Sequence, residues 1–187
     1  LHLCDYNLEK MGRTSTTKHD LLLDVCYAAK YEGNSINTHY TIHQHKYGNS
    51  ASQLCTVLAR SFADIGDIVR GKDLYLGDKG EKKKLEKNLK RIFGDIYRDV
   101  TSGRTNGQTL KDRYKDDPEF FKLREDWWAL NRQDVWKAIT CEVKSGNNYF
   151  RRTCGKNDTG TDDKCRCAGS NADQVPTYFD YVPQYLR

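Results

Sequence analysis

The chain has 187 residues and a formal net charge of +5, which is enough length for one domain with its own core or for a large part of a bigger one. Its 37% hydrophobic content is low, but three Trp, twelve Tyr and six Phe supply the bulky side chains that a disordered chain lacks. No run of about 18 apolar residues is present, so this segment is not expected to span a membrane. The first residues are polar and include Cys4, so no signal peptide is expected in them.

The first predicted helix follows Thr17, whose hydroxyl can cap it while Asp20 completes a capping-box-like pattern. Its apolar face consists of Leu21, Leu22, Val25, Ala28 and Ala29. Gly33 suits the end of this helix. Residues 33–50 carry Gly, Asn, Ser and three His without any periodicity, and they are predicted to form a loop.

Two amphipathic helices are predicted next. The first runs from about Ser52 to Val69, with Leu54, Leu58, Phe62, Ile65 and Val69 in one stripe. The second spans about Glu81 to Val100, and its buried side is expected to hold Leu85, Leu89, Ile92, Phe93, Ile96 and Val100. The Gly/Thr/Asn-rich stretch 101–109 should break it.

The last predicted helix starts at Asp117-Pro118, a good N-cap followed by Pro at the first helical position, and it extends to Cys141. Its bulky residues are Phe120, Trp127, Trp128, Val135, Trp136 and Ile139. Because they surround much of the helix, core packing is favoured for the three Trp over a sugar-binding platform. Strand-like alternation is scarce, so the fold class is predicted to be all-α, a helical bundle with long irregular loops.

The segment GDIVRGKD at 66–73 is close to a phosphate-binding P-loop, but Asp73 stands where that loop needs Ser or Thr. A P-loop follows a buried strand and precedes a helix, whereas this segment ends a predicted helix. The negative end of the helix dipole would repel phosphate there. We therefore predict that Gly71 simply ends the helix, with Arg70 and Lys72 near its C-terminus.

Seven cysteines are scattered along the chain: Cys4, Cys26, Cys55, Cys141, Cys154, Cys165 and Cys167. No C-x-x-C pair indicates a metal site, so disulfides are favoured, which implies an oxidising, extracellular setting. The odd number predicts that one partner lies outside this chain. Cys154 and Cys165, with ten residues of a Gly/Asp/Thr-rich loop between them, are expected to be the easiest pair to close, and Cys167 stays unassigned.

Five segments carry a resemblance to a known family: LHLCDYNLE at 1–9, LLLDVCYAAKYEG at 21–33, ARSFADIGDIVRGKDLYLG at 59–77, LREDWWALNRQDVWKAITC at 123–141 and VPTYFDYVPQYLR at 175–187. Together they resemble the Duffy-binding-like domain, α class, of the variant erythrocyte membrane proteins of the malaria parasite. The resemblance implies a disulfide-bonded helical adhesin without catalysis. It also implies a partial domain, in which about 1–48 end a first subdomain, about 49–174 form a central one and about 175–187 begin a last one.

The most informative charge feature is the segment 79–91, with seven basic and two acidic residues. The rest of the chain holds 24 basic and 24 acidic residues, so this segment carries the whole net charge. The residues Lys83, Lys84, Lys87, Lys90, Arg91 and Arg98 fall on an arc of about 120° opposite the apolar stripe. Such a face attracts polyanions, although it can also be an ordinary solvated surface. Members of the resembled family often bind heparan sulfate or red-cell glycans, so this face is a candidate glycan site.

Other candidates are weaker. Arg151 and Arg152, held beside Cys154, are a second candidate basic point for glycan, against the alternative of ordinary surface arginines. The three basic residues Lys111, Arg113 and Lys115 alternate with acidic ones. The histidines of HYTIHQH at 39–45 lack the carboxylate of a zinc-protease motif, so no metal is expected. No catalytic constellation and no cofactor are indicated, and an enzyme is the least favoured class.

The sequence thus predicts an adhesin domain that binds host red-cell or endothelial receptors, leading to rosetting or cytoadherence. Its expected partners are heparan sulfate-like glycans, host receptor proteins and host antibodies, and its expected location is the extracellular face of the infected red cell, within a larger membrane protein. The first alternative is a protein-receptor-binding module of the same fold with no glycan role. The second, an intracellular nucleic-acid-binding protein, is disfavoured because it requires free thiols.

Overall fold

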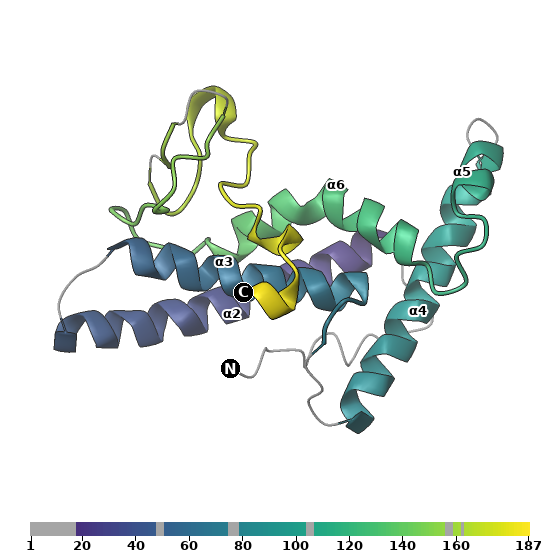
Figure 1. The fold of residues 1–187 in the computed structure, drawn as a ribbon, viewed down its shortest axis with the longest axis horizontal. Helices are drawn as coiled ribbons and strands as arrows, with labels where there is room; N and C mark the ends of the chain where they lie inside the picture. The colour runs from purple at the N-terminus through teal and green to yellow at the C-terminus, as the bar shows by residue number, and fades with distance from the viewer. Residues whose placement is uncertain (1–17, 48–50, 75–78, 104–106, 156–158, 162) are drawn as a thin grey trace.

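The computed structural model describes residues 18–47, 51–74, 79–103, 107–155, 159–161 and 163–187. Its helices are α2 (Lys18–Tyr47), α3 (Ala51–Arg70), α4 (Lys79–Thr101), α5 (Gly107–Arg113) and α6 (Phe121–Ile139), with 3-10 turns η1 (Gly169–Asn171), η2 (Phe179–Tyr181) and η3 (Gln184–Leu186). Figure 1 shows α2, α3 and α6 side by side, α4 crossing their end, and the loop after α6 above the opposite end. The described residues contain two isolated β-bridges and no strand, so the predicted all-α class is confirmed.

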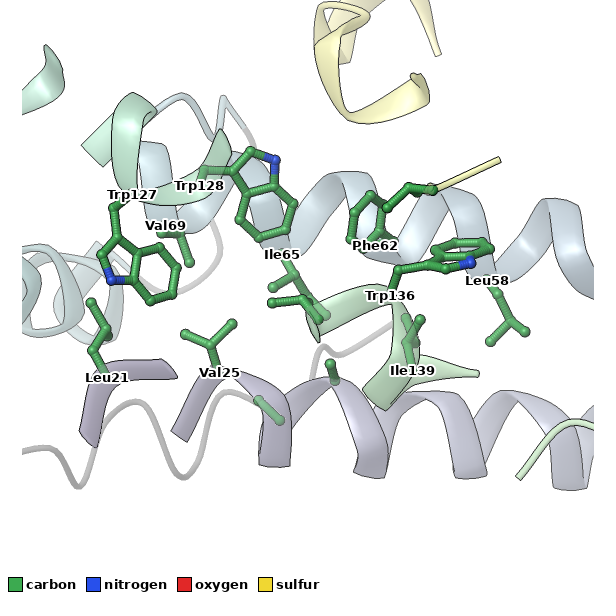
Figure 2. Close-up of a cluster of buried hydrophobic side chains, with 14 of the residues drawn as sticks. Leu21, Val25, Leu58, Phe62, Ile65, Val69, Trp127, Trp128, Trp136 and Ile139 are labelled. Carbon is green, nitrogen blue, oxygen red and sulfur yellow. The ribbon is translucent and has the colours of Figure 1, made fainter. Parts of the chain in front are cut away.

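The core lies where α2, α3 and α6 pack against one another. The apolar stripe of α3 is buried as its periodicity predicts, and all three tryptophans of α6 are buried as well. Phe62 of α3 contacts two of them, with ring centroids 5.1 Å from Trp128 and 5.2 Å from Trp136. Trp127 lies above Leu21 of α2 (Figure 2). The tryptophans are therefore core residues, as predicted.

Helix α2 is longer than the sequence suggests, and the prediction of a loop from Gly33 to residue 50 is wrong, since the helix continues to Tyr47. Gly33 does not end the helix but lies where the α2 backbone passes close to the end of α6. A Cβ atom at this position would lie 1.9 Å from the carbonyl oxygen of Ile139. The glycine is therefore required by a helix crossing, which the local sequence cannot distinguish from a helix end.

The end of α3 is the one predicted. Gly71 has φ of +73°, the amide of Gly71 donates to Ile68 O at 3.1 Å, and the amide of Lys72 donates to Asp67 O at 2.8 Å. These two bonds make a Schellman motif, which satisfies carbonyls that the helix leaves free. The segment 66–73 is thus a helix C-terminus, as predicted.

The start of α6 differs from the prediction. Pro118 precedes the helix, and the residue before its first turn is Phe120, in the left-handed conformation with φ of 57°. The Asp117 carboxylate still satisfies the first turn, because it accepts hydrogen bonds from the amides of Phe121 at 2.9 Å and Lys122 at 2.8 Å. The helix ends at Ile139, two residues before the predicted end at Cys141.

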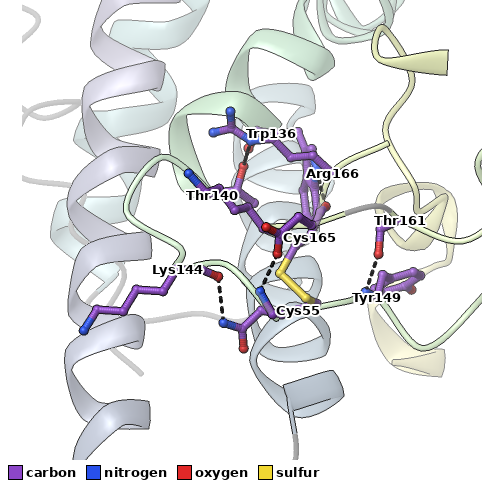
Figure 3. Close-up of a disulfide and its surroundings, with 12 residues drawn as sticks. Cys55, Trp136, Thr140, Lys144, Tyr149, Thr161, Cys165 and Arg166 are labelled. Carbon is purple, nitrogen blue, oxygen red and sulfur yellow. Dashed lines mark hydrogen bonds between the residues drawn. A yellow bond between two sulfur atoms is a disulfide. The ribbon is translucent and has the colours of Figure 1, made fainter. Parts of the chain in front are cut away.

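Two disulfides close the loop after α6, Cys55–Cys165 and Cys154–Cys167. The predicted Cys154–Cys165 pair is therefore wrong. Cys165 bonds to Cys55 of α3 instead. It is positioned by α6 and the loop, because its carbonyl accepts the indole N–H of Trp136 at 3.1 Å and its amide donates to Asn147 O at 2.8 Å (Figure 3). This bond spans 110 residues, so it restricts the unfolded chain far more than a bond within the loop.

The other three cysteines are not paired by these bonds. Cys26 and Cys141 are free thiols here, whereas all seven cysteines were predicted to form disulfides, with one partner outside the chain. Cys4 lies outside the described residues. Burial, with the charge of Asp134 adding to it, raises the pKa of the Cys26 thiol to about 11. A thiol with so high a pKa is a poor nucleophile at neutral pH. The division of the chain near residues 48 and 174 stays a prediction.

The role of Gly33 in the helix crossing can be tested by comparing its substitution with that of a glycine whose surroundings have space for a methyl group. We expect Gly33→Ala to lower the free energy of unfolding by about 3 kcal/mol, because the backbone of α2 or α6 must shift. At Gly94 in α4 a Cβ would meet only the Phe120 ring, at 3.6 Å, so Gly94→Ala should be neutral or raise stability by up to about 1 kcal/mol. Chemical denaturation followed by circular dichroism measures both; equal effects would contradict the crossing.

Candidate functional site

The basic face of α4 is exposed, as its amphipathic pattern predicts. Its apolar side packs inward, where Phe93 meets Trp127 edge to face at a centroid distance of 6.1 Å. The opposite side carries Lys83, Lys84 and Lys87, all exposed. Within the described part of the chain, none of these three makes an ion pair. Their charges are therefore free to act on an external ligand.

The other basic residues of this face are partly neutralised. Lys90 pairs with Glu119. Arg91 lies 3.6 Å from Asp95 Oδ2, and Arg98 pairs with the other oxygen of the same carboxylate, Oδ1. All of these pairs are at least partly exposed, so each contributes little to stability and a polyanion can compete for the cations. The face thus divides into three free lysines, which we call the lysine triplet (Lys83, Lys84 and Lys87), and a paired remainder.

The orientation of α4 is fixed by a buried arginine of α6. Arg124 is 0% exposed, and it donates to the carbonyls of Val69 at 2.6 Å and Ile68 at 3.1 Å, at the end of α3. The same guanidinium pairs with both carboxylate oxygens of Glu86 in α4. A cation at a helix C-terminus is favoured by the helix dipole. Arg124 therefore joins α3, α4 and α6 at one point.

Arg151 and Arg152 do not extend the α4 face. They lie in the loop after α6, which Figure 1 places at the opposite end of the molecule from α4. Both are exposed, and the Arg151 guanidinium lies over the Phe150 ring, 5.3 Å from its centroid. The predicted second basic point is thus a separate surface.

This second surface borders a groove of about 340 Å³. Three segments line it: Thr56, Ala59 and Arg60 of α3; Tyr149, Phe150, Arg151 and Thr153 of the loop; and Pro176, Thr177, Tyr178, Phe179 and Val182 near the C-terminus. Hydrogen bonds join the second and third segments, from Tyr149 Oη to Thr177 Oγ1 at 3.1 Å and from Thr153 Oγ1 to Pro176 O. These two hydrogen bonds therefore hold the loop wall and the C-terminal wall of the groove together.

A buried carboxylate holds the C-terminal segment against α6. Asp180 is fully buried and accepts two hydrogen bonds from Arg132, at 2.8 and 2.7 Å, and one from the Trp128 indole at 2.8 Å. Arg132 also donates to Thr177 O at 2.7 Å. A buried carboxylate with this many donors is fully paired, so the groove wall at 176–182 is fixed by α6.

The remaining candidates do not form a site. Arg113 makes two 2.7 Å hydrogen bonds with Asp126, and they hold the pKa of the Asp126 carboxyl below its usual value. His39 is exposed on α2, and the side chains of the other two histidines lie outside the described residues. In the described residues no group of three or more His, Cys, Asp or Glu could hold a metal ion, and no helix has the length and apolarity to cross a membrane.

Sequence reasoning missed Arg60 and the groove. Arg60 lies on the polar side of α3, where periodicity marks it only as a surface residue. The aromatic residues at 149–150 and 178–179 belong to irregular segments, and only the fold brings them together. The single available signal was the aromatic content of VPTYFDYVPQYLR, which a core interpretation explains equally well.

These features define a helical, disulfide-bonded domain with two separate basic surfaces. The chain belongs to the Duffy binding domain family, whose model matches residues 1–187. The resemblance found in the sequence is therefore confirmed.

Solved structures with the same fold support this assignment. The NTS-DBL1-alpha and CIDR-gamma double domain of PfEMP1 from the Plasmodium falciparum varO strain is 41% identical, with a TM-score of 0.80 over 99% of this chain and 25% of that one. The DBLbeta domain of a PfEMP1 bound to ICAM-1 is 31% identical, with a TM-score of 0.63 over 100% of this chain and 38% of that one. The Duffy receptor gamma form of Plasmodium knowlesi is 27% identical over 81% of this chain and 12% of its own length. The chain thus spans only a minor part of each relative.

The buried Asp180 can be tested against an exposed aspartate nearby. We expect Asp180→Ala to lower the free energy of unfolding by about 4 kcal/mol, because it leaves the Arg132 charge and the Trp128 indole N–H without their partner. Asp173 is exposed and accepts only a long 3.4 Å bond from Gln133, so Asp173→Ala should change stability by less than about 0.5 kcal/mol. Urea unfolding measures both, and a small effect at Asp180 would contradict its role.

Proposed function

We propose that this chain is part of an extracellular adhesin that binds host red-cell or endothelial receptors, and that the lysine triplet of α4 binds sulfated glycans of the heparan sulfate type. The observation that carries the proposal is three exposed lysines without ion pairs in the described chain, on the segment that holds the whole net charge. The proposed outcome of binding is rosetting or cytoadherence. The proposed location is the surface of the infected red cell, where host antibodies would also meet the domain.

Electrostatics supports a polyanionic ligand for this face. Lysines that neutralise a sulfated chain release its condensed counterions, and the affinity then falls steeply as salt rises. The three charges lie within two turns of one helix, so one short stretch of glycan can meet all of them. The paired residues Lys90, Arg91 and Arg98 border the triplet and would strengthen binding when their weak pairs exchange for sulfate.

A protein receptor is the second candidate, favoured by the DBLbeta relative whose structure is bound to ICAM-1. In that case the lysine triplet would only keep α4 soluble. The two candidates differ in how strongly binding depends on salt and on the lysines. Charge mainly raises the rate at which the partners meet, whereas the shape of the surface determines which partner binds.

The first test measures heparin binding of the disulfide-bonded chain across a salt series. A basic residue at an anionic surface contributes about 1 kcal/mol, so replacing Lys83, Lys84 and Lys87 by Glu should weaken heparin binding by about 100-fold or more. The slope of log affinity against log salt should also become shallower in the variant.

The matched control replaces three scattered lysines, Lys30, Lys115 and Lys144, by Glu. All three are exposed, and the net charge changes by the same amount. This control should keep most of the heparin affinity. Equal losses in the two variants would mean that only net charge matters, and retained binding in the triplet variant would reject the α4 site.

A further inference from the structure

The groove beside the cysteine loop is lined by positive charges that make no ion pair within the described chain. Arg60 and Arg151 line it, and both are exposed. Among the described residues, neither arginine makes an ion pair, and the lining contains no carboxylate. Two guanidinium groups without ion pairs thus line one concave surface, where they attract a negatively charged partner.

The rest of the lining is mostly apolar and aromatic, with three threonines among it. Phe150 is 56% and Tyr178 is 68% exposed, but each ring packs against a neighbouring side chain. The Phe150 ring contacts Tyr149 at a centroid distance of 5.0 Å, and the Tyr178 ring packs on the Arg132 guanidinium at 5.5 Å. Exposed aromatic side chains held in place on a fixed wall cost little entropy on binding, which is typical of protein-binding anchors.

Size and chemistry together point to one kind of occupant. A volume of about 340 Å³ is enough for one or two large side chains, not for a folded domain. The apolar walls favour a group that leaves water readily, whereas a sulfated polysaccharide is polar along its whole length. The arginines favour carboxylates, which they bind with two parallel hydrogen bonds.

We propose that this groove binds an acidic segment of a partner protein, with a large apolar or aromatic side chain seated between Phe150 and Tyr178 and carboxylates paired with Arg60 and Arg151. The proposal rests on the proposed adhesin function and assigns the protein-receptor part of it to a specific surface. Because α4 lies at the opposite end of the molecule (Figure 1), glycan and protein can bind at the same time.

The test uses a fluorescent peptide of alternating glutamate and phenylalanine, and a second peptide with serine in place of each phenylalanine. Binding of each to the disulfide-bonded chain is measured by fluorescence polarisation. We expect saturable binding of the first peptide and at least about tenfold weaker binding of the second, since the apolar contact supplies over 1.4 kcal/mol. The double variant Arg60→Glu with Arg151→Glu should lose at least about tenfold in affinity for the first peptide.

Two further variants separate the contributions. Tyr178→Ala removes an exposed side chain, so the fold should survive while peptide affinity falls. The triplet variant of α4 should bind the peptide unchanged, and the arginine variant should keep its affinity for heparin. Circular dichroism confirms that each variant is folded.

The proposal fails if both peptides bind equally, because charge alone would then explain binding. It also fails if neither peptide binds. A third contrary result is a loss of heparin affinity in the arginine variant as large as that in the triplet variant. The last outcome would assign the groove to the glycan surface. The two peptide results do not bear on the α4 site, whose heparin response is measured with its own variant.

Discussion

The guanidinium group of Arg124 joins three helices at one buried point. It binds the last carbonyls of α3 and, from α6, reaches the Glu86 carboxylate of α4. Both neighbours suit its charge, because a helix C-terminus and a carboxylate are negative. Helix α4 lies across the end of the α3–α6 pair, and this contact, together with the packing of Phe93 on Trp127, sets which side of α4 faces solvent. A fully buried arginine without these acceptors would be very costly, so the arrangement is strongly specified.

The opposite end of the same core is organised in a similar way. Arg132 and Trp128 of α6 hold Asp180, and the Cys55–Cys165 disulfide holds the loop against α3. One tryptophan-bearing helix thus fixes two surfaces that share no residue: a lysine face suited to a polyanion and an aromatic groove suited to an acidic peptide. Under the two proposals, this separation would let one scaffold bind two kinds of partner.

Sequence periodicity predicted α3, α4 and the three core tryptophans well, because each pattern reflects one buried face. It failed at Gly33, where a tertiary helix crossing needs the same residue as a helix end. It also failed at Cys165, whose partner is chosen by contacts of the folded loop and not by loop length. Of the two candidate surfaces, the lysine face was predictable from the charge of the segment and the helical spacing of its lysines. The groove was not, since its residues come from three segments that only the fold brings together.

The most direct measurement is lysine acetylation of the chain with and without heparin, mapped by mass spectrometry. If the α4 face is the glycan site, heparin should slow acetylation at Lys83, Lys84 and Lys87 and leave Lys144 and Lys164 in the cysteine loop unchanged. All five are exposed, so their unprotected rates are comparable. Uniform protection, or protection confined to the loop lysines, would contradict a glycan site on α4.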